Sequence, residues 1–326
     1  MSEKRAQEKR DTVIKPKRVS FFRDVMNNKF SYLIALPAIL YVFIFSYWAY
    51  PYMITAFQRF DFRNNTWWAM FTRGEWVGLT NFRFFFTSVH APVVIFNTFY
   101  LNLLFIITGT VSAVLLALLL NELSSTKFVK TTQSFMIVPS YISWVVISFI
   151  LTSIFSTRLG IANQLLEFFG QEPVNWYLNP DVWPSILVGV RIWRGSGMSA
   201  IIFLAALAGM DTEIFESASI DGANRFQKLI YMKLPLLMPT IMIITLLSIG
   251  RIMFGDFGMI FAIIGDNGVL FPTTDVIDTF LFRALRMVGD PSQAMAIGLF
   301  QSAIGFILVF GSNWLTRKFY PDGALY

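Results

Sequence analysis

The chain of 326 residues has no cysteine and a single histidine. The lack of cysteine excludes disulfides, thiolate zinc sites and iron–sulfur clusters, and it leaves the redox compartment open. The one histidine, His90, cannot build a histidine-rich metal site, so we expect a solvated side chain in a polar loop. The sequence also lacks a Gly-Lys dipeptide, and therefore the phosphate-binding loop of P-loop ATPases. We expect no catalytic residue, metal site or cofactor in this chain.

Charge is scarce as well. Charged residues make up 14% of the chain and hydrophobic residues 55%, with a mean hydropathy of +0.58, whereas soluble domains carry roughly 25% charged residues. The net charge of +6 does not indicate nucleic acid, because nine of the 26 basic residues fall in the first 31 positions, directly before an apolar run. Attraction to anionic membrane lipid explains that arrangement.

Long apolar runs are abundant instead, and about 20 apolar residues suffice to cross a bilayer as a helix. The polar start of the chain and the first apolar run are both too long for a cleaved signal peptide, so we expect an uncleaved anchor. The fourth and fifth runs are the weakest, because each holds two charged residues. The sequence predicts an all-α integral membrane protein with six transmembrane helices, at 32–54, 94–120, 133–155, 184–210, 235–263 and 292–316.

The distribution of lysine and arginine predicts the orientation. With the N-terminus inside, 16 of these residues lie on the cytoplasmic side and 7 outside, as the positive-inside rule requires. Both termini are then cytoplasmic. The predicted organisation is a basic tail at 1–31, a transmembrane domain at 32–316 with a functional loop at 211–235, and a C-terminal tail at 317–326.

The predicted outer loops differ in character. The second loop has apolar residues at helical spacing between Gly160 and Gly170, which predicts a short amphipathic helix. The third, 264–291, opens with turn residues. The first, 55–93, is rich in aromatic residues and is predicted to form an interfacial belt; they are Trp67, Trp68, Trp76, Phe82, Phe84, Phe85 and Phe86.

The inner loop at 211–235 is more than a polar connector. Asp211 offers an N-cap for a helix that starts near Glu213, and Gly222 can end that helix. A second short helix then runs toward Pro235, at the start of the fifth span. Without further information this is a surface helical hairpin under the bundle.

The same loop resembles the EAA loop of binding-protein-dependent ABC importer permeases. That pattern is Glu-Ala-Ala, three residues, Gly, nine residues, then Ile-x-Leu-Pro. The sequence matches this spacing throughout and departs only in having Ser217 for the middle alanine and Met232 for isoleucine. The residues that carry the match are Glu216, Ser217, Ala218, Gly222, Met232, Leu234 and Pro235, with Asp221 just before the glycine.

Softer motifs extend the resemblance over most of the chain and place it in the maltose-permease-like, LplB-like branch for complex saccharides. Residues 78–82 resemble the Gly-Leu-x-Asn-Phe of carbohydrate permeases, and residues 163–166 their outer-loop helix. Residues 204–207, 296–300 and 313–318 resemble further family segments.

The resemblance implies a type I ABC importer permease in the bacterial cytoplasmic membrane. The implied partners are a second permease subunit in a heterodimer, two copies of a cytoplasmic ATPase that bind ATP and Mg²⁺, an extracytoplasmic solute-binding protein and an oligosaccharide. The loop is then a coupling helix: Glu216 pairs with an ATPase arginine, Asp221 does the same or caps the second helix, and Gly222 supplies the bend.

Sugars are bound by aromatic faces and polar groups, and charges within spans tend to face a cavity or to pair. Arg251 and Asp256 are five residues apart and are poorly placed to pair on one helix, so at least one should line the path or the partner interface. Arg191 and Arg194 either join them or snorkel to the outer boundary. The candidates for the substrate path are Tyr141, Trp144, Trp193, Arg251, Asp256 and Gln301, with Asn97 and Asn102 as further polar groups.

Two other classes of transport stay open. One is a permease for another solute, such as a polyol, glycerol phosphate or a peptide. The other is an ion-coupled secondary transporter. Such a transporter is expected to carry several acids within its spans, and Asp256 is the one clear acid there.

Overall fold

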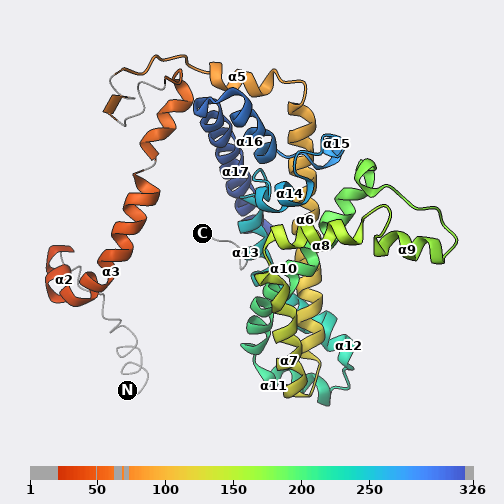
Figure 1. The fold of residues 1–326 in the computed structure, drawn as a ribbon. Coiled ribbons are helices and arrows are strands. Elements are labelled where there is room, and N and C mark those ends of the chain that lie inside the picture. Colours follow the sequence, from red (N-terminus) through yellow and green to blue (C-terminus); the bar gives the residue numbers. More distant parts are fainter. Residues whose placement is uncertain (1–20, 49, 62–67, 70–72, 320–326) are drawn as a thin grey trace. The chain divides into compact units, whose positions relative to one another are not determined.

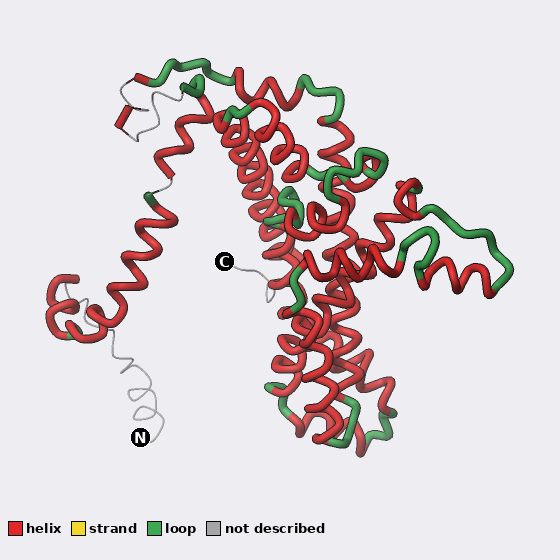
Figure 2. The backbone as a smooth tube through the Cα atoms, in the orientation of Figure 1, coloured by secondary structure: helices red, strands yellow, loops and turns green. Residues whose placement is uncertain are grey.

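The computed structural model of the protein describes residues 21–48, 50–61, 68–69 and 73–319. Parts of both predicted tails, and the predicted belt residue Trp67, lie outside these residues. Within the described residues the chain is helical and forms no strand beyond an isolated bridge between Gln58 and Trp76 (Figure 2). The predicted all-α fold class is confirmed.

The chain divides into two units, 1–54 and 55–326. The first contains α2 (Phe21–Asn27), α3 (Lys29–Val42) and a π-helical turn, η1 (Phe43–Tyr47); η2 (Tyr50–Phe57) crosses the unit boundary. Together Lys29–Phe57 is long and apolar enough to span a membrane. The first span therefore starts three residues before its predicted position, inside the predicted tail.

Four long helices dominate the second unit: α6 (Ala91–Asn121), α10 (Trp183–Ala208), α13 (Leu234–Ile249) and α17 (Pro291–Phe319) (Figure 1). The helices α6 and α10 pack along each other, and α13 packs against α6, α10 and α17. Their approach depends on glycine. A Cβ on Gly305 would lie 2.5 Å from the carbonyl oxygen of Gly250, so the end of α13 contacts α17 backbone to backbone.

The third predicted span is bent. It consists of α7 (Thr126–Ile137), η4 (Val138–Tyr141) and α8 (Trp144–Ile154), with 94° between its halves. Pro139 lies in the turn, and Ser143 caps α8 by accepting a hydrogen bond from the N–H of Val146 (3.3 Å). The prediction of one helix over 133–155 is therefore wrong. The described residues hold five helices able to span a membrane, or six if the bent pair is one span.

The fifth predicted span is also interrupted. The helix α13 ends at Ile249, a turn follows over 250–256, and α14 (Phe257–Ile264) begins with Asp256 as its N-cap. The Asp256 carboxylate accepts a hydrogen bond from the N–H of Met259 (3.2 Å). A single helix over 235–263 is therefore wrong, and the break falls on the charged residues that weakened this span.

The first predicted outer loop is more ordered than a belt. Gly78 adopts a left-handed conformation (φ 58°) before α5 (Thr80–Phe86). The side-chain amide of Asn81 donates to the carbonyls of Ala56 (2.9 Å) and Gln58 (2.8 Å). Phe85 is buried against Phe280 and Phe300. The exposed side chains of Trp68 and Trp76 are compatible with the predicted interfacial belt. Phe85, in contrast, belongs to the core.

The second predicted outer loop contains α9 (Ile161–Phe168), so the predicted helix is confirmed. Asn163 of this helix is buried and ties the loop together: its side chain bonds the backbone of Thr157 and Val174 and accepts from the indole of Trp176 (2.8 Å). Two 3-10 turns, η5 (Trp176–Leu178) and η6 (Pro180–Val182), lead into α10.

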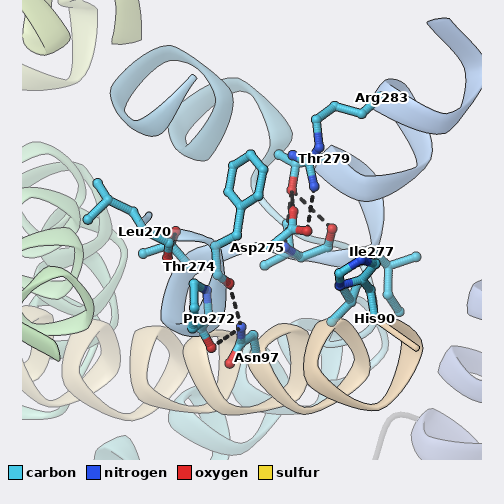
Figure 3. A network of polar contacts seen from close by, with 12 residues as sticks. His90, Asn97, Leu270, Pro272, Thr274, Asp275, Ile277, Thr279 and Arg283 are labelled. Carbon is cyan, nitrogen blue, oxygen red and sulfur yellow. Dashed lines mark hydrogen bonds and ion pairs between the residues drawn. The ribbon is translucent and has the colours of Figure 1, made fainter. Parts of the chain in front are cut away.

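The third predicted outer loop folds onto α6 as α15 (Phe271–Thr274) and α16 (Ile277–Val288) (Figure 3). The amide of Asn97 donates to the carbonyl of Pro272 (3.1 Å), and the hydroxyl of Thr98 accepts from the N–H of Ile277 (2.9 Å). Asp275 accepts from Thr279 and from Arg283. Asn97 is thus a structural anchor, and His90, at the N-cap position of α6, is exposed as predicted.

Candidate functional site

A cavity of about 550 Å³ opens between α6, α10 and the turn at 250–256. On α6 it is lined between Asn102 and Ala113. One apolar cluster lies on either side of that stretch, the first containing Leu101 and the second Leu118. The volume falls within the range of roughly 300–1,000 Å³ typical of small-molecule sites.

An ion pair crosses this cavity. Arg191 of α10 donates to the carboxylate of Asp256 over 2.5 Å, and its guanidinium lies 4.7 Å from the ring centroid of Phe105 on α6. Both charged side chains remain partly exposed, at 37% and 27%. The sequence analysis considered only Arg251, on the same predicted span, as a partner for Asp256. The actual partner, Arg191, comes from another helix.

The other two arginines line the same cavity. Arg194 donates to the carbonyl of Ile142 (3.1 Å) and lies over the indole of Trp144, 4.3 Å from its centroid. It therefore holds the bend between α7 and α8 in place. Arg194 and Arg191 both join Arg251 and Asp256 at the cavity, which is the first of the two predicted alternatives. Arg251 is exposed, and its guanidinium has no partner among the residues that the structure describes.

The turn that presents Arg251 and Asp256 is held from α16 and α17. The N–H of Gly255 donates to the carboxylate of Asp278 (2.5 Å), and the amide of Gln301 donates to that carboxylate (3.2 Å) and to the carbonyl of Met253 (2.8 Å). Burial raises the pKa of Asp278 above the usual value of an aspartate, although these donors act in the opposite direction. A Cβ on Gly255 would meet the side chain of Val276 at 2.6 Å.

The six predicted path residues therefore separate into two groups. Trp144, Arg251 and Asp256 line the cavity together. Tyr141 (78% exposed) and Trp193 (49% exposed) are not among its lining residues, and Gln301 is buried behind the turn.

Several lining residues were missed by the sequence analysis. Hydroxyl groups are common among them. Asn102, which was predicted as a further polar group of the path, also lines the cavity and donates to the carbonyl of Thr98 (2.8 Å). Residues 191, 195 and 199 recur every four positions along α10, and this helical spacing from a charged residue was the available signal. The missed lining residues include Thr108, Thr110, Ser196, Ser199, Ser248 and Phe254.

The predicted helix pair forms the other candidate region. The helix α11 (Thr212–Ile220) is capped by Asp211, which accepts from the N–H of Glu213 (3.0 Å), as predicted. It ends at Gly222, where φ is 86°. The N–H of Ala223 donates to the carbonyl of Ala218 (2.9 Å), and that of Gly222 to Ser219 (3.2 Å). These bonds form a Schellman motif, which needs the left-handed glycine.

The second short helix, α12 (Arg225–Lys228), is capped by Asn224 in a capping box with Gln227. The alternative that Asp221 caps this helix is therefore wrong; Asp221 is the C-cap residue of α11 and is exposed. The chain then continues through a π-helical turn, η7 (Leu229–Lys233), directly into α13. Pro235 thus lies inside one helix, Arg225–Ile249.

The exposed face of this pair combines a free carboxylate with apolar groups. Glu216 is exposed and bonds to no other residue in the described part of the chain. On the same two helices, Ile220 is 87% exposed and Phe226 71% exposed. Ser217 donates to the carbonyl of Glu213, and the remaining motif residues Ala218, Met232 and Leu234 are half-buried, with Pro235 exposed.

The helix pair is clamped to the end of α6. Lys233 donates to the carboxylate of Glu122 (2.5 Å) and to the side chain of Asn121 (2.6 Å), beside a second cavity of about 420 Å³. Because the same α6 lines the charged cavity further along, one rigid helix joins the two regions. In Figure 1, α11 and α12 lie at the lower end of α6, opposite to α15 and α16.

Comparisons with known proteins found a matching family and similar sequences. Residues 109–321 match the family described as "binding-protein-dependent transport system inner membrane component". Protein LplB of Bacillus subtilis (strain 168) is 30% identical over 307 residues, 94% of each chain. The polygalacturonan/rhamnogalacturonan transport system permease protein YteP of the same organism is 32% identical over 316 residues, 96% of each chain.

A solved structure has the same fold. A chain in the crystal structure of a bacterial alginate ABC transporter, in complex with an alginate pentasaccharide-bound periplasmic protein, matches with a TM-score of 0.80 and 26% identity. The match covers 92% of this chain and 98% of that one.

Proposed function

The chain belongs to the family of binding-protein-dependent transport system inner membrane components, and from that premise we propose that its cargo is an oligosaccharide. The predicted family resemblance and the permease role in an ABC importer are confirmed, and the chain is a multi-pass membrane component of such an importer. The names of the relatives support the choice of cargo, since one is a permease for polygalacturonan and rhamnogalacturonan, and the solved transporter carries alginate.

The cavity supports the same cargo. Aromatic rings of Trp144, Phe105 and Phe254 and several hydroxyl groups line one space of suitable size. Saccharides present both apolar C–H faces and many hydroxyl groups, and a site with aromatic faces and hydrogen-bonding side chains complements both. The cavity is formed by one chain, and in our proposal a second permease subunit completes the path.

The single observation that carries the coupling role is the face of α11 and α12. A carboxylate without a partner among the described residues, on a helix pair with exposed apolar side chains, is what a surface that docks onto another protein requires. In our proposal Glu216 pairs with a basic residue of a cytoplasmic ATPase, of which two copies serve the importer. Both termini then lie in the cytoplasm, and a separate solute-binding protein delivers cargo to the other side.

The contacts of Lys233 and α6 supply a physical route for coupling. A displacement of the docked pair moves Lys233, and through its ion pair with Glu122 it moves the 31-residue helix α6. Since α6 forms one wall of the charged cavity, the cavity then opens and closes with the ATPase. This is a rigid-body mechanism with packed helices as levers.

The test is transport by the complete importer in proteoliposomes. We expect Glu216→Ala to reduce ATP-driven uptake about tenfold or more, by removing a charge-assisted contact, and to weaken copurification of the ATPase. Glu172→Gln, which removes the same charge from an exposed site in the second predicted outer loop, is the control and should transport normally. Normal uptake and ATPase binding by Glu216→Ala would contradict the docking role.

Gly222 permits a more closely matched pair. Gly222 (φ 86°) and Gly170 (φ 73°) both have left-handed backbones and open space around the missing Cβ. Alanine at either position introduces a similar strain of about 1 kcal/mol. We expect Gly222→Ala to reduce coupling of ATP hydrolysis to uptake, and Gly170→Ala to leave it unchanged. Equal effects would show that strain alone, and not the docking surface, is responsible.

The same vesicles separate the other cargo classes. Uptake of glycerol 3-phosphate, a polyol or a peptide in place of any saccharide would replace the proposed cargo. Uptake driven by an ion gradient in the absence of ATP would favour a secondary transporter.

A further inference from the structure

The charges of the cavity do not balance. Its lining includes three arginines, Arg191, Arg194 and Arg251, and one acid, Asp256. The formal sum is an excess of two positive charges within a space bounded by membrane-spanning helices. Such charges are costly away from water and persist where they pair or bind something.

Two of the arginines are already engaged. Arg191 has the carboxylate of Asp256 at 2.5 Å and the ring of Phe105 beneath it. Arg194 is occupied by the carbonyl of Ile142 and the face of Trp144. These contacts fix both side chains, and they neutralise only the charge of Arg191.

Arg251 differs from both. Within the described residues its guanidinium has neither an acid nor a carbonyl partner, and the side chain is exposed in the cavity. Its backbone is nevertheless fixed, because the turn that carries it is bonded to Asp278 and Gln301 through Gly255 and Met253. On a backbone held in place, the described part of the molecule thus presents a guanidinium without a partner to the proposed path.

A guanidinium is a planar fork of donors that matches a carboxylate in a bidentate arrangement. We propose that Arg251 binds the carboxylate of an acidic, uronate-containing oligosaccharide, with Arg194 supplying a second positive charge. This inference rests on the proposed saccharide import and narrows it to one substrate class. The aromatic and hydroxyl-bearing walls contact the sugar rings, and the arginine selects for the acid.

The experiment uses the complete importer in proteoliposomes with two forms of one probe. The first is a short oligogalacturonate or oligomannuronate, and the second is the same oligomer with its carboxyl groups reduced to hydroxymethyl groups. We expect ATP-driven uptake of the acidic form at a rate that exceeds that of the neutral form.

Variants then assign the selectivity to the residue. We expect Arg251→Gln to raise the KM for the acidic form about 10- to 100-fold with a smaller change in kcat, as expected for a lost charge-assisted contact. Arg251→Lys should recover part of this loss, because the charge remains but the fork is lost. Arg158→Gln removes the same charge from an exposed loop site outside the cavity lining and should behave as the wild type.

The outcomes separate the two levels of the proposal. Uptake of the neutral forms alone would leave saccharide import intact and overturn the role of Arg251. An equal loss for both forms in Arg251→Gln, or no loss for the acidic form, would also overturn it. Failure to import any saccharide with ATP would refute the proposed function itself, and the inference with it.

Discussion

The two ends of the fifth predicted span respond differently to residues that disfavour a helix. At its amino end Pro235 cannot donate a backbone hydrogen bond, yet the helix runs on from Arg225 through η7 to Ile249. At its carboxyl end no proline is present, yet the helix stops at Gly250 and turns. The amino end carries the proposed docking surface, and the carboxyl end presents Arg251 and Asp256 to the cavity.

The difference shows which local defects a helix absorbs. A missing donor is accommodated by widening one turn: the N–H of Leu234 bonds the carbonyl of Leu229, five residues back, so the ring of Pro235 finds room. Charged side chains at membrane depth cannot be accommodated in that way, because they need partners from other helices. The break in the helix turns Asp256 toward Arg191. The backbone groups of the turn that lose their helical hydrogen bonds are bonded by side chains of α16 and α17.

The largest effect should come from breaking the ion pair at the carboxyl end. Asp256→Asn leaves the guanidinium of Arg191 partly buried without its acid, and we expect a loss of stability of about 1–2 kcal/mol, discounted because both side chains are partly exposed. Uptake by the reconstituted importer should fall at least about tenfold. Thermal unfolding of the purified protein and uptake assays measure the two effects.

Its control is Asp266→Asn, which breaks the exposed pair with Arg286 (59% and 58% exposed) and should change stability by less than about 0.5 kcal/mol. Equal destabilisation by both variants would contradict the view that the pair across the cavity is special. Combining Asp256→Asn with Arg191→Met removes both charges and keeps a side chain that can cap α14, so it should restore most of the stability and leave uptake low.

A smaller effect is expected at the amino end. Pro235→Ala restores a backbone donor, so we expect the π-helical turn to relax to an α-helix, with a gain in stability of about 1 kcal/mol. An α-helical turn holds one residue fewer than a π-helical turn, so this relaxation rotates α12 relative to α13. Coupling of ATP hydrolysis to uptake should therefore fall a few-fold. Thermal unfolding and the ratio of sugar imported to ATP hydrolysed are the measurements.

Pro239→Ala, four residues further along the same helix, is the matched control because no π turn precedes it within α13. It should gain similar stability and retain its coupling ratio. A coupling loss in both variants would mean that helix rigidity, and not the orientation of α12, sets the ratio.

The smallest effect concerns the support behind the break. Because burial raises the pKa of Asp278 in the folded protein, its contribution to stability is fully present below the unfolded-state pKa and is lost as the pH rises through the folded pKa. The melting temperature of the wild type relative to Asp278→Asn should therefore rise as the pH is lowered from about 7 to about 4. A constant difference across that range would contradict a raised pKa of Asp278 in the folded protein.

Much of this protein was determined by its sequence alone. Long apolar blocks required lipid-spanning helices, and the order of Asp211, Glu216, Gly222 and Pro235 predicted a capped helix, a glycine end and a second helix. These features are local: caps, left-handed glycines and apolar runs depend on neighbours a few residues away, so a single sequence displays them.

Tertiary structure decided the bend between α7 and α8, the break after Ile249 and the membership of the charged cavity. Arg191 and Asp256 are separated by 65 positions in the chain, and Asp278 and Gln301 hold the turn from still other helices. Pairing across helices depends on how their surfaces pack and which side chains then share a space. Periodicity along one helix does not contain that information, and for this reason the partner of Asp256 was missed.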